Sequence, residues 1–77
     1  MDKKATDVMI YTQAKLDDEQ FSEITRQVRT IDGVTRFERS QHKPQFILVA
    51  YQASKTRALA ILDKITRMGF NASLVGI

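Results

Sequence analysis

The spacing of the apolar residues changes along this chain, and the change limits the folds that it can form. Val8 and Ile10 alternate with Met9 and Tyr11 within residues 7–13, which is the two-residue period of a half-buried strand. From residue 21 the apolar side chains recur every three or four residues, which is the spacing of one helix face. These positions are Phe21, Ile24, Val28 and Ile31. The first part of the chain therefore predicts a strand and then a helix, which the glycine of the pair at 32–33 should end.

The second half of the chain repeats this change of period. Residues 34–40 alternate imperfectly around Phe37, and residues 45–51 form the nearly continuous apolar run of a central strand. Between them, "QHKP" at 41–44 predicts a hairpin connection with its proline at the strand edge. We expect Ser54 to cap a second helix that Gly69 ends, and residues 70–77 to form the last strand. The apolar face of this helix would be Ala58, Ile61, Leu62 and Ile65.

The predicted order of elements is βαββαβ, and it favours one architecture. Two βαβ halves with right-handed crossovers give a four-stranded antiparallel sheet with both helices on one face. This is the α+β ferredoxin-like sandwich, and 77 residues are enough for a single domain spanning 1–77. Because this fold hosts many unrelated functions, the function has to be argued from a site.

Composition excludes several kinds of site. The chain has no cysteine, which rules out disulfides, thiolate metal ligands and cysteine nucleophiles. No apolar run approaches the roughly 20 residues of a membrane span, and residues 1–13 lack the apolar stretch of a signal peptide. We therefore expect a cytoplasmic protein without membrane insertion. Its net charge of +3 is a small bias, below the basicity of a dedicated nucleic-acid binder.

Parts of the sequence resemble the heavy-metal-associated domain family. This family includes small copper chaperones and the cytosolic metal-binding domains of metal-transporting P-type ATPases. The likeness extends over residues 7–77 and rests on "IDGVTRFE", on "QFILVAYQASKTRALAILDKITRMGFNASLVGI" and on the helical stripe that begins at Phe21. These are core and turn positions, so the resemblance implies the ferredoxin-like fold more directly than it implies any chemistry.

The signature of the family is a Met-x-Cys-x-x-Cys loop at the start of the first helix, where two thiolates hold a soft metal ion. Counting back from Gly33, the two cysteine positions fall on Asp17 and Gln20. The methionine position falls on Lys15 or Leu16. The resemblance therefore implies a domain of this family that has lost its thiolate metal site.

The acids in the stretch "AKLDDEQFSEI" have a structural explanation. Asp17 and Gln20 have the spacing of a capping box, and Asp18 and Glu19 in the first turn would complement the positive end of the helix. A hard cation is the alternative, but Ca²⁺ requires six to eight oxygen ligands and this loop supplies few. Acid–base catalysis is not favoured, because no serine, histidine or second carboxylate stands at a recognisable spacing. We expect a helix cap, no cofactor and no enzymatic activity.

His42 is the only histidine, and it is the remaining candidate metal ligand. The hairpin that carries it should lie at the same end of the fold as the acidic loop. However, the expected sheet order puts two strand spacings, roughly 10 Å, between the first and second strands. A metal site combining His42 with Asp18 or Glu19 would therefore require the hairpin to fold over the loop.

Basic residues gather at the opposite end of the expected fold. Lys55 and Arg57 are predicted in the first turn of the second helix, where positive charge is unfavourable. They would meet residues near the end of the first helix, the start of the second strand and the chain start, against only Asp7 and Asp32. We name this group the basic pole: Lys3, Lys4, Arg26, Arg29, Arg36, Lys55 and Arg57. It is either a solvated face or a docking surface for an acidic partner.

The sequence thus favours a small protein-interaction or regulatory module associated with heavy-metal transport. Its expected partner is a protein with an acidic surface, for example a metal transporter. One alternative is a metal-ion carrier that uses ligands other than cysteine. Another is a nucleic-acid-binding domain, in which Tyr11 and Phe46 or Tyr51 would stack on bases. The strand "KPQFILVAY" lacks the Gly–aromatic pattern of RNA-recognition domains, so the sequence does not favour this alternative.

Overall fold

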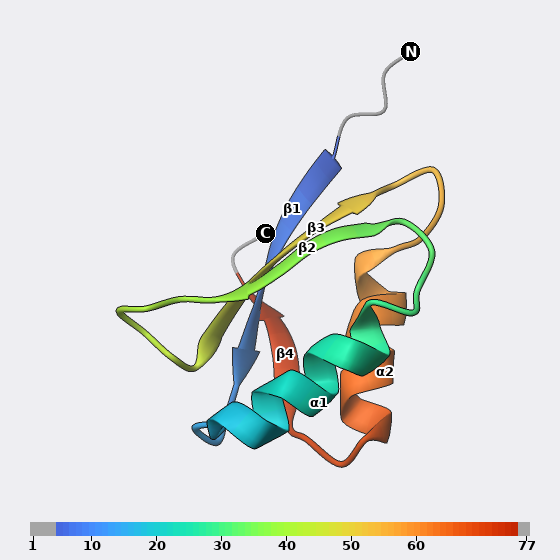
Figure 1. Ribbon diagram of the computed structural model, residues 1–77. Coiled ribbons are helices and arrows are strands. Elements are labelled where there is room, and N and C mark those ends of the chain that lie inside the picture. Colours follow the sequence, from blue (N-terminus) through green and yellow to red (C-terminus); the bar gives the residue numbers. More distant parts are fainter. Residues whose placement is uncertain (1–4, 76–77) are drawn as a thin grey trace.

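The computed structural model describes residues 5–75, and its elements follow the predicted βαββαβ order (Figure 1). The first half contains β1 (Ala5–Thr12), α1 (Asp18–Val28) and β2 (Val34–Arg39). The second half contains β3 (Phe46–Gln52), α2 (Ala58–Arg67) and β4 (Ala72–Val75). The predicted strands and helices are all present, with boundaries that shift by a few residues.

The four strands form one antiparallel sheet in the order β2-β3-β1-β4. Both helices lie side by side on one face of this sheet (Figure 1). The predicted ferredoxin-like sandwich is therefore confirmed, as is the prediction that 45–51 is a central strand. Since β3 lies between them, β1 and β2 are two strand positions apart.

The core lies between the sheet and the helices. Along β1, Val8, Ile10 and Thr12 are buried while Met9 and Tyr11 are only partly covered, as the two-residue period predicts. The helices add a buried stripe at the predicted spacing. Its fully buried members are Ile24, Val28, Ile61 and Ile65.

A β-bulge explains the imperfect alternation within β2. Val34 and Phe37 both pack toward the core, although residues three apart point to opposite faces of a regular strand. The pairing of β2 with β3 shifts between Val34 and Arg36, which inserts one extra residue at Thr35. The Thr35 hydroxyl donates to the Ala50 carbonyl across this irregularity (3.1 Å). The bulge thus turns Phe37 inward and Arg36 toward the helix-free face.

The first helix ends earlier than predicted. It stops at Val28 with Arg29 as C-cap, and Ile31 packs against the core from the turn that follows. Gly33 has a positive φ of 107°, but it lies in the turn that enters β2 rather than at the end of the helix. A Cβ at this position would come within 2.8 Å of the Lys55 Cβ. Close packing of the two loops, together with the backbone angle, requires glycine here.

The start of the second helix also differs from the prediction. Ser54 does not cap it: the N-cap is Arg57, which makes no side-chain capping bond. The backbone N–H groups of Lys55 and Thr56 both donate to the Gln52 carbonyl (2.9 and 3.1 Å), so Ser54 lies in a tight turn before the helix. The prediction that Lys55 and Arg57 belong to the first turn is therefore wrong, since both precede Ala58, where the helix begins. The first turn contains no acidic residue.

The end of the second helix agrees with the prediction. Gly69 follows the C-cap Met68 and has a positive φ of 99°, the conformation expected of a glycine just past a helix. The last strand begins at Ala72, two residues later than predicted. The final residues of the predicted strand, 76–77, lie outside the described residues.

Candidate functional site: the loop before α1 and the basic pole

The loop that enters α1 is the one that the sequence resemblance aligns with the family's metal loop. Asp17 is the N-cap, and its Oδ1 accepts a hydrogen bond from the Gln20 N–H (2.7 Å). In return the Gln20 Oε1 accepts one from the Asp17 N–H (3.1 Å). The predicted capping box is confirmed. Both side chains that stand where the family has cysteines are thus engaged with the helix start.

Arg39, at the end of β2, holds the same loop from the side. Its guanidinium donates to the Leu16 carbonyl (2.9 Å) and to the Asp18 Oδ1 (2.7 Å). The carbon of this group also lies 4.6 Å from the centroid of the Phe21 ring, which stacks on Phe37 with centroids 5.6 Å apart. Because the planar guanidinium makes polar and stacking contacts at once, it fixes the loop relative to β2.

The start of the loop is held by a second side chain. The Gln45 amide donates to the carbonyls of Thr12 (3.0 Å) and Gln13 (2.7 Å). The backbone adds a bond from the Thr12 N–H to the Gln45 carbonyl (2.8 Å), and one from the Gln13 N–H to the Asn71 carbonyl (3.0 Å). The loop is therefore fixed at both ends by hydrogen bonds within the chain.

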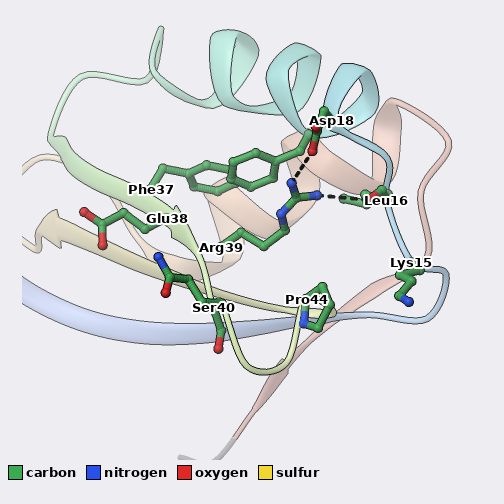
Figure 2. A pocket seen from close by; sticks show the side chains of 10 residues that line it. Lys15, Leu16, Asp18, Phe37, Glu38, Arg39, Ser40 and Pro44 are labelled. Atoms are coloured by element: carbon green, nitrogen blue, oxygen red, sulfur yellow. Dashed lines mark hydrogen bonds and ion pairs between the residues drawn. The ribbon is translucent and has the colours of Figure 1, made fainter.

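An open hollow of about 630 Å³ lies beside this loop (Figure 2). Lys15 and Asp18 border it from the loop, and Ser40 and Pro44 border it from the β2–β3 hairpin. Arg39 crosses it to reach Leu16 and Asp18, as the dashed lines in Figure 2 show. The Leu16 carbonyl and the Asp18 carboxylate are therefore bonded to a cation of the protein itself.

The other candidate metal ligands are not brought together. Glu19 is exposed in the first turn of α1, and His42 is exposed on the hairpin. His42 lines a separate hollow with Met9 and Leu48, whereas Asp18 lines the hollow beside the loop. Among residues 5–75, no group of three histidine, aspartate or glutamate side chains is close enough to hold a metal ion.

The opposite end of the molecule joins the turn before β2 to the turn before α2. The Gln52 N–H donates to the Gly33 carbonyl (2.8 Å), and the Lys55 Nζ lies 3.8 Å from the Asp32 Oδ1. Arg29 is exposed at the end of α1, and Arg57 is exposed at the start of α2. The structure thus brings the ends of the two helices that contribute to the basic pole to the same side of the fold (Figure 1).

Some of the charge at the basic pole is balanced locally. Arg26 pairs with Glu23 one turn earlier in α1. Arg36 pairs with Glu38 (3.0 Å), whose hydrogen bond and negative charge raise the pKa of the arginine. Within residues 5–75, Arg29 and Arg57 have no acidic partner within 4 Å. Two further members of the basic pole, Lys3 and Lys4, lie outside the described residues.

The three aromatic candidates for base stacking separate into two groups. Tyr51 is buried on the helix side of the sheet, with 8% of its surface exposed, so it cannot stack on a ligand. Tyr11 and Phe46 are register partners on β1 and β3, on the helix-free face, with ring centroids 5.3 Å apart. The rings are tilted by 50° against each other, and each therefore covers part of its neighbour.

Sequence reasoning did not identify Arg39 or Gln45 as parts of this site. Arg39 is one of two arginines in β2, and the sequence does not distinguish it from Arg36. Its partners in the loop are 21 to 23 residues earlier in the chain. The one signal available was its position at the last residue of a strand next to a hairpin.

Neither helix of the described residues has the length and apolar character that crossing a membrane demands.

Comparisons with known proteins support the fold. The structure is similar to the crystal structure of oxidized MerP from Ralstonia metallidurans CH34, with a TM-score of 0.81 and 11% identity over 95% of this chain and 100% of that chain. It is also similar to the CsoZ metallochaperone, with a TM-score of 0.74 and 20% identity over 95% of this chain and 100% of that one.

A third similar structure is a copper binding domain from HMA7, a P-type ATPase. Its TM-score is 0.79 with 11% identity, and the match covers 91% of this chain and 93% of that chain. No protein-family model matches the sequence, and no curated protein matches it either. The chain therefore has the fold of the heavy-metal-associated domains, in a sequence without cysteine.

Proposed function

We propose that this chain is a protein-interaction module with the heavy-metal-associated fold that no longer carries a soft metal ion. It would serve a heavy-metal transport system by binding an acidic surface of a partner such as a metal transporter, and it would not be an enzyme. The observation that carries this proposal is the loop before α1. Asp17 and Gln20 cap the helix, and Arg39 bonds the loop from β2, so the polar groups of the loop are already engaged within the chain.

The chemistry of the loop also favours this proposal over a metal carrier. Soft ions such as Cu(I) select thiolate and thioether ligands, whereas this loop offers a carboxylate and an amide. The Asp17 carboxylate already accepts from a backbone N–H, and the Asp18 carboxylate already accepts from Arg39. A metal ion would have to break these hydrogen bonds and would gain weaker ligands. The residues present do not fit a soft metal.

The basic pole is the surface that we assign to the partner. Arg26, Arg29, Lys55 and Arg57 come from two helix ends and the turn between strand and helix. Arg57 stands at the positive end of α2, where a basic side chain is unfavourable by about 0.3–1 kcal/mol. Helix stability does not explain this residue, but attraction of an acidic surface does.

Metal titration followed by amide NMR tests the first part of the proposal. We expect no stoichiometric binding of Cu(I) or Zn(II), because the chain supplies no thiolate and one imidazole. Binding at micromolar affinity or better, with shifts centred on Asp17, Gln20 and His42, would establish the metal-carrier alternative instead.

Charge reversal tests the second part. In the variant with glutamate at Arg26, Arg29, Lys55 and Arg57, we expect loss of partner capture from the source cells, with an unchanged fold by circular dichroism. Arg67→Glu at the far end of α2 is the matched control and should retain capture, since Arg67 is also exposed and its ion pair with Asp63 is a surface pair of small value. Capture should weaken with salt, because exposed charges are screened beyond about 8–10 Å.

Alanine at Tyr11 or Phe46 distinguishes a protein partner from nucleic acid. These substitutions should leave a contact at the basic pole unchanged, because the two rings lie on the helix-free face of the sheet. Nucleic-acid binding would instead weaken by about 1–3 kcal/mol per stacked base. The proposal would be refuted if the aromatic variants lost partner capture while the charge-reversal variant kept it.

A further inference from the structure

The face of the sheet opposite the helices carries a connected apolar band. Met9 and Leu48 are register partners on the two central strands, and so are Tyr11 and Phe46. Val75 extends the band onto β4 as the partner of Met9. All five side chains are partly covered, and both helices lie on the other face (Figure 1). These side chains give the helix-free face an apolar centre that no other element of the described residues covers.

Charges of both signs border this band in a regular arrangement. Asp7 on β1 and Arg36 on β2 are both register partners of Ala50 on β3, so they stand in one row on either side of a small side chain. Arg36 faces this side because of the bulge at Thr35. Glu38 follows on β2, and Lys43 lies over the Phe46 ring with its Nζ 5.9 Å from the centroid. Among residues 5–75, the band is therefore bordered by two acids and two bases.

This balance of charge argues against a polyanion. Protein surfaces that bind nucleic acids are positively charged, because contacts with the phosphates supply most of the affinity. Here Asp7 and Glu38 oppose Arg36 and Lys43, and the two aromatic rings partly cover each other instead of standing free for bases. The face is better suited to a neutral surface that has the same mixture of apolar and charged groups.

The arrangement fits a second copy of the same chain, and we propose that the helix-free face forms a weak symmetric dimer. A two-fold axis along β3 places Arg36 of each copy opposite Asp7 of the other, and it does so twice, because a two-fold contact is self-complementary. Leu48 and Phe46 then meet their own counterparts across the axis. Met9 of each copy lies opposite Glu38 of the other, because both are register partners of Leu48. Packed sheets lie about 10 Å apart, a gap that an arginine and an aspartate reaching from opposite sides can span.

The size of the face sets the strength of this dimer. With the axis along β3, the strands that overlap are β2, β3 and β1. Three strands about 4.8 Å apart, over about six residues of about 3.3 Å each, give a face of roughly 300 Å² in projection per copy. Two such faces amount to roughly 600 Å², which is below standard-size interfaces and belongs to weak, transient contacts. We therefore expect a weak dimer, with monomer and dimer in exchange.

The dimer shares one residue of the basic pole, Arg36, which faces the helix-free side of β2. The four residues assigned to the partner contact, Arg26, Arg29, Lys55 and Arg57, lie at the helix ends and in the turn before α2. The helix ends that carry Arg29 and Arg57 lie on the opposite side of the sheet from the apolar band (Figure 1). Glutamate at Arg29 and Arg57 should therefore leave self-association unchanged. Failure of either proposal can be recognised separately.

Sedimentation equilibrium and amide NMR over a concentration series from about 20 µM to about 1 mM test the dimer. We expect the average mass to rise with concentration, with shift changes centred on Met9, Leu48 and Phe46. Asp7→Arg alone and Arg36→Asp alone should each weaken association by about tenfold or more, because like charges then face each other at both contacts. Arg26→Asp, a charge change of the same kind on α1, is the matched control and should have no effect.

Mixing the two single variants gives the decisive measurement. In a mixed dimer, one contact joins the unchanged Arg36 of one copy to the unchanged Asp7 of the other. The second contact joins the two substituted side chains, whose charges are exchanged but still opposite, so both contacts are attractive again. We expect a one-to-one mixture to recover association to within about threefold of the parent chain. Recovery also shows that neither variant is misfolded.

Several outcomes would overturn the proposal. These are absence of association in the parent chain at about 1 mM, failure of the mixture to recover, and shift changes centred on the helices. Tight binding of an oligouridine probe to this face would overturn it as well, because a surface that binds a polyanion is not the balanced face that the dimer requires.

Discussion

The two helices of this protein begin in opposite ways. At the start of α1, Asp17 and Gln20 form a complete capping box, and two acids follow in the first turn. At the start of α2, the N-cap is Arg57, which makes no side-chain capping bond, and the first turn has no acid. A cap is worth about 0.5–2 kcal/mol, and first-turn charges add a few tenths each, so the difference in local stability is substantial.

This contrast shows which helix start is explained by stability alone. At the start of α1, Asp17, Asp18 and Gln20 each have a hydrogen-bonding partner within the chain, although the sequence resemblance aligns this loop with the family's metal loop. The start of α2 is locally unfavourable, and it lies in the basic pole that we propose as the partner surface. Four predictions test this contrast.

The largest expected effect is the return of a metal site at the start of α1. Replacing Asp17 and Gln20 by cysteine places two thiolates at the helix N-cap and three residues later, which is the ligand type that Cu(I) selects. We expect stoichiometric Cu(I) binding by absorption spectroscopy and titration. Asp17→Cys alone is the control, because a single thiolate should bind far more weakly. A folded double variant that takes up no soft metal would show that the loop does not correspond to the family's metal loop.

A second prediction concerns the packing near the start of α2. Gly33→Ala should lower the free energy of unfolding by about 2–3 kcal/mol, because it adds a Cβ 2.8 Å from that of Lys55 to a backbone with φ of 107°. Gly69→Ala is the matched control, with a φ of 99° and no heavy atom within 4 Å, and should cost about 1 kcal/mol. If urea unfolding gave equal losses of stability for the two variants, the close approach of Gly33 to Lys55 would contribute nothing.

A third prediction separates the two bonds of Arg39. Arg39→Lys should cost about 1.5 kcal/mol in urea unfolding, because lysine cannot bond the Leu16 carbonyl and Asp18 together while stacking on Phe21. Asp18→Asn removes only the ion pair, and its side chain is 98% exposed, so the loss should stay below about 0.5 kcal/mol. A larger loss of stability in Asp18→Asn than in Arg39→Lys would indicate that the ion pair holds the loop, and not the contacts of Arg39 with the Leu16 carbonyl and the Phe21 ring.

The smallest effects should have opposite signs at the two helix starts. Asp17→Ala should destabilise by about 1 kcal/mol, since it removes the cap of α1. Arg57→Asp should stabilise by about 0.5 kcal/mol, because it gives α2 a capping carboxylate and a favourable charge at its positive end. If the basic pole binds the partner, Arg57→Asp should also reduce capture. A variant that gains stability and keeps full capture would leave the arginine without a role.

Much of this structure is determined by residues that are close together in the sequence. The change from a two-residue to a helical period predicts the order of elements, and this order with right-handed crossovers predicts the sheet. The capping box at Asp17 and Gln20 was also predicted, because both partners are three residues apart. The N-cap of α2 was not, since Ser54 has the right residue type but the backbone turns back onto Gln52 before the helix begins.

The features that only the tertiary structure decided join residues that are distant in the chain. Arg39 bonds a loop 21 to 23 residues earlier, Gly33 packs against Lys55, and Arg36 and Asp7 share a row of the sheet through Ala50. Nothing in the local pattern specifies such pairs, because strand register and the bulge at Thr35 decide which side chains meet. The sequence by itself determined the elements and the cap of α1 through local hydrogen bonds and apolar periodicity. The folded sheet decided the rest, because contacts across strands depend on register, and a shift of one residue would exchange the two faces.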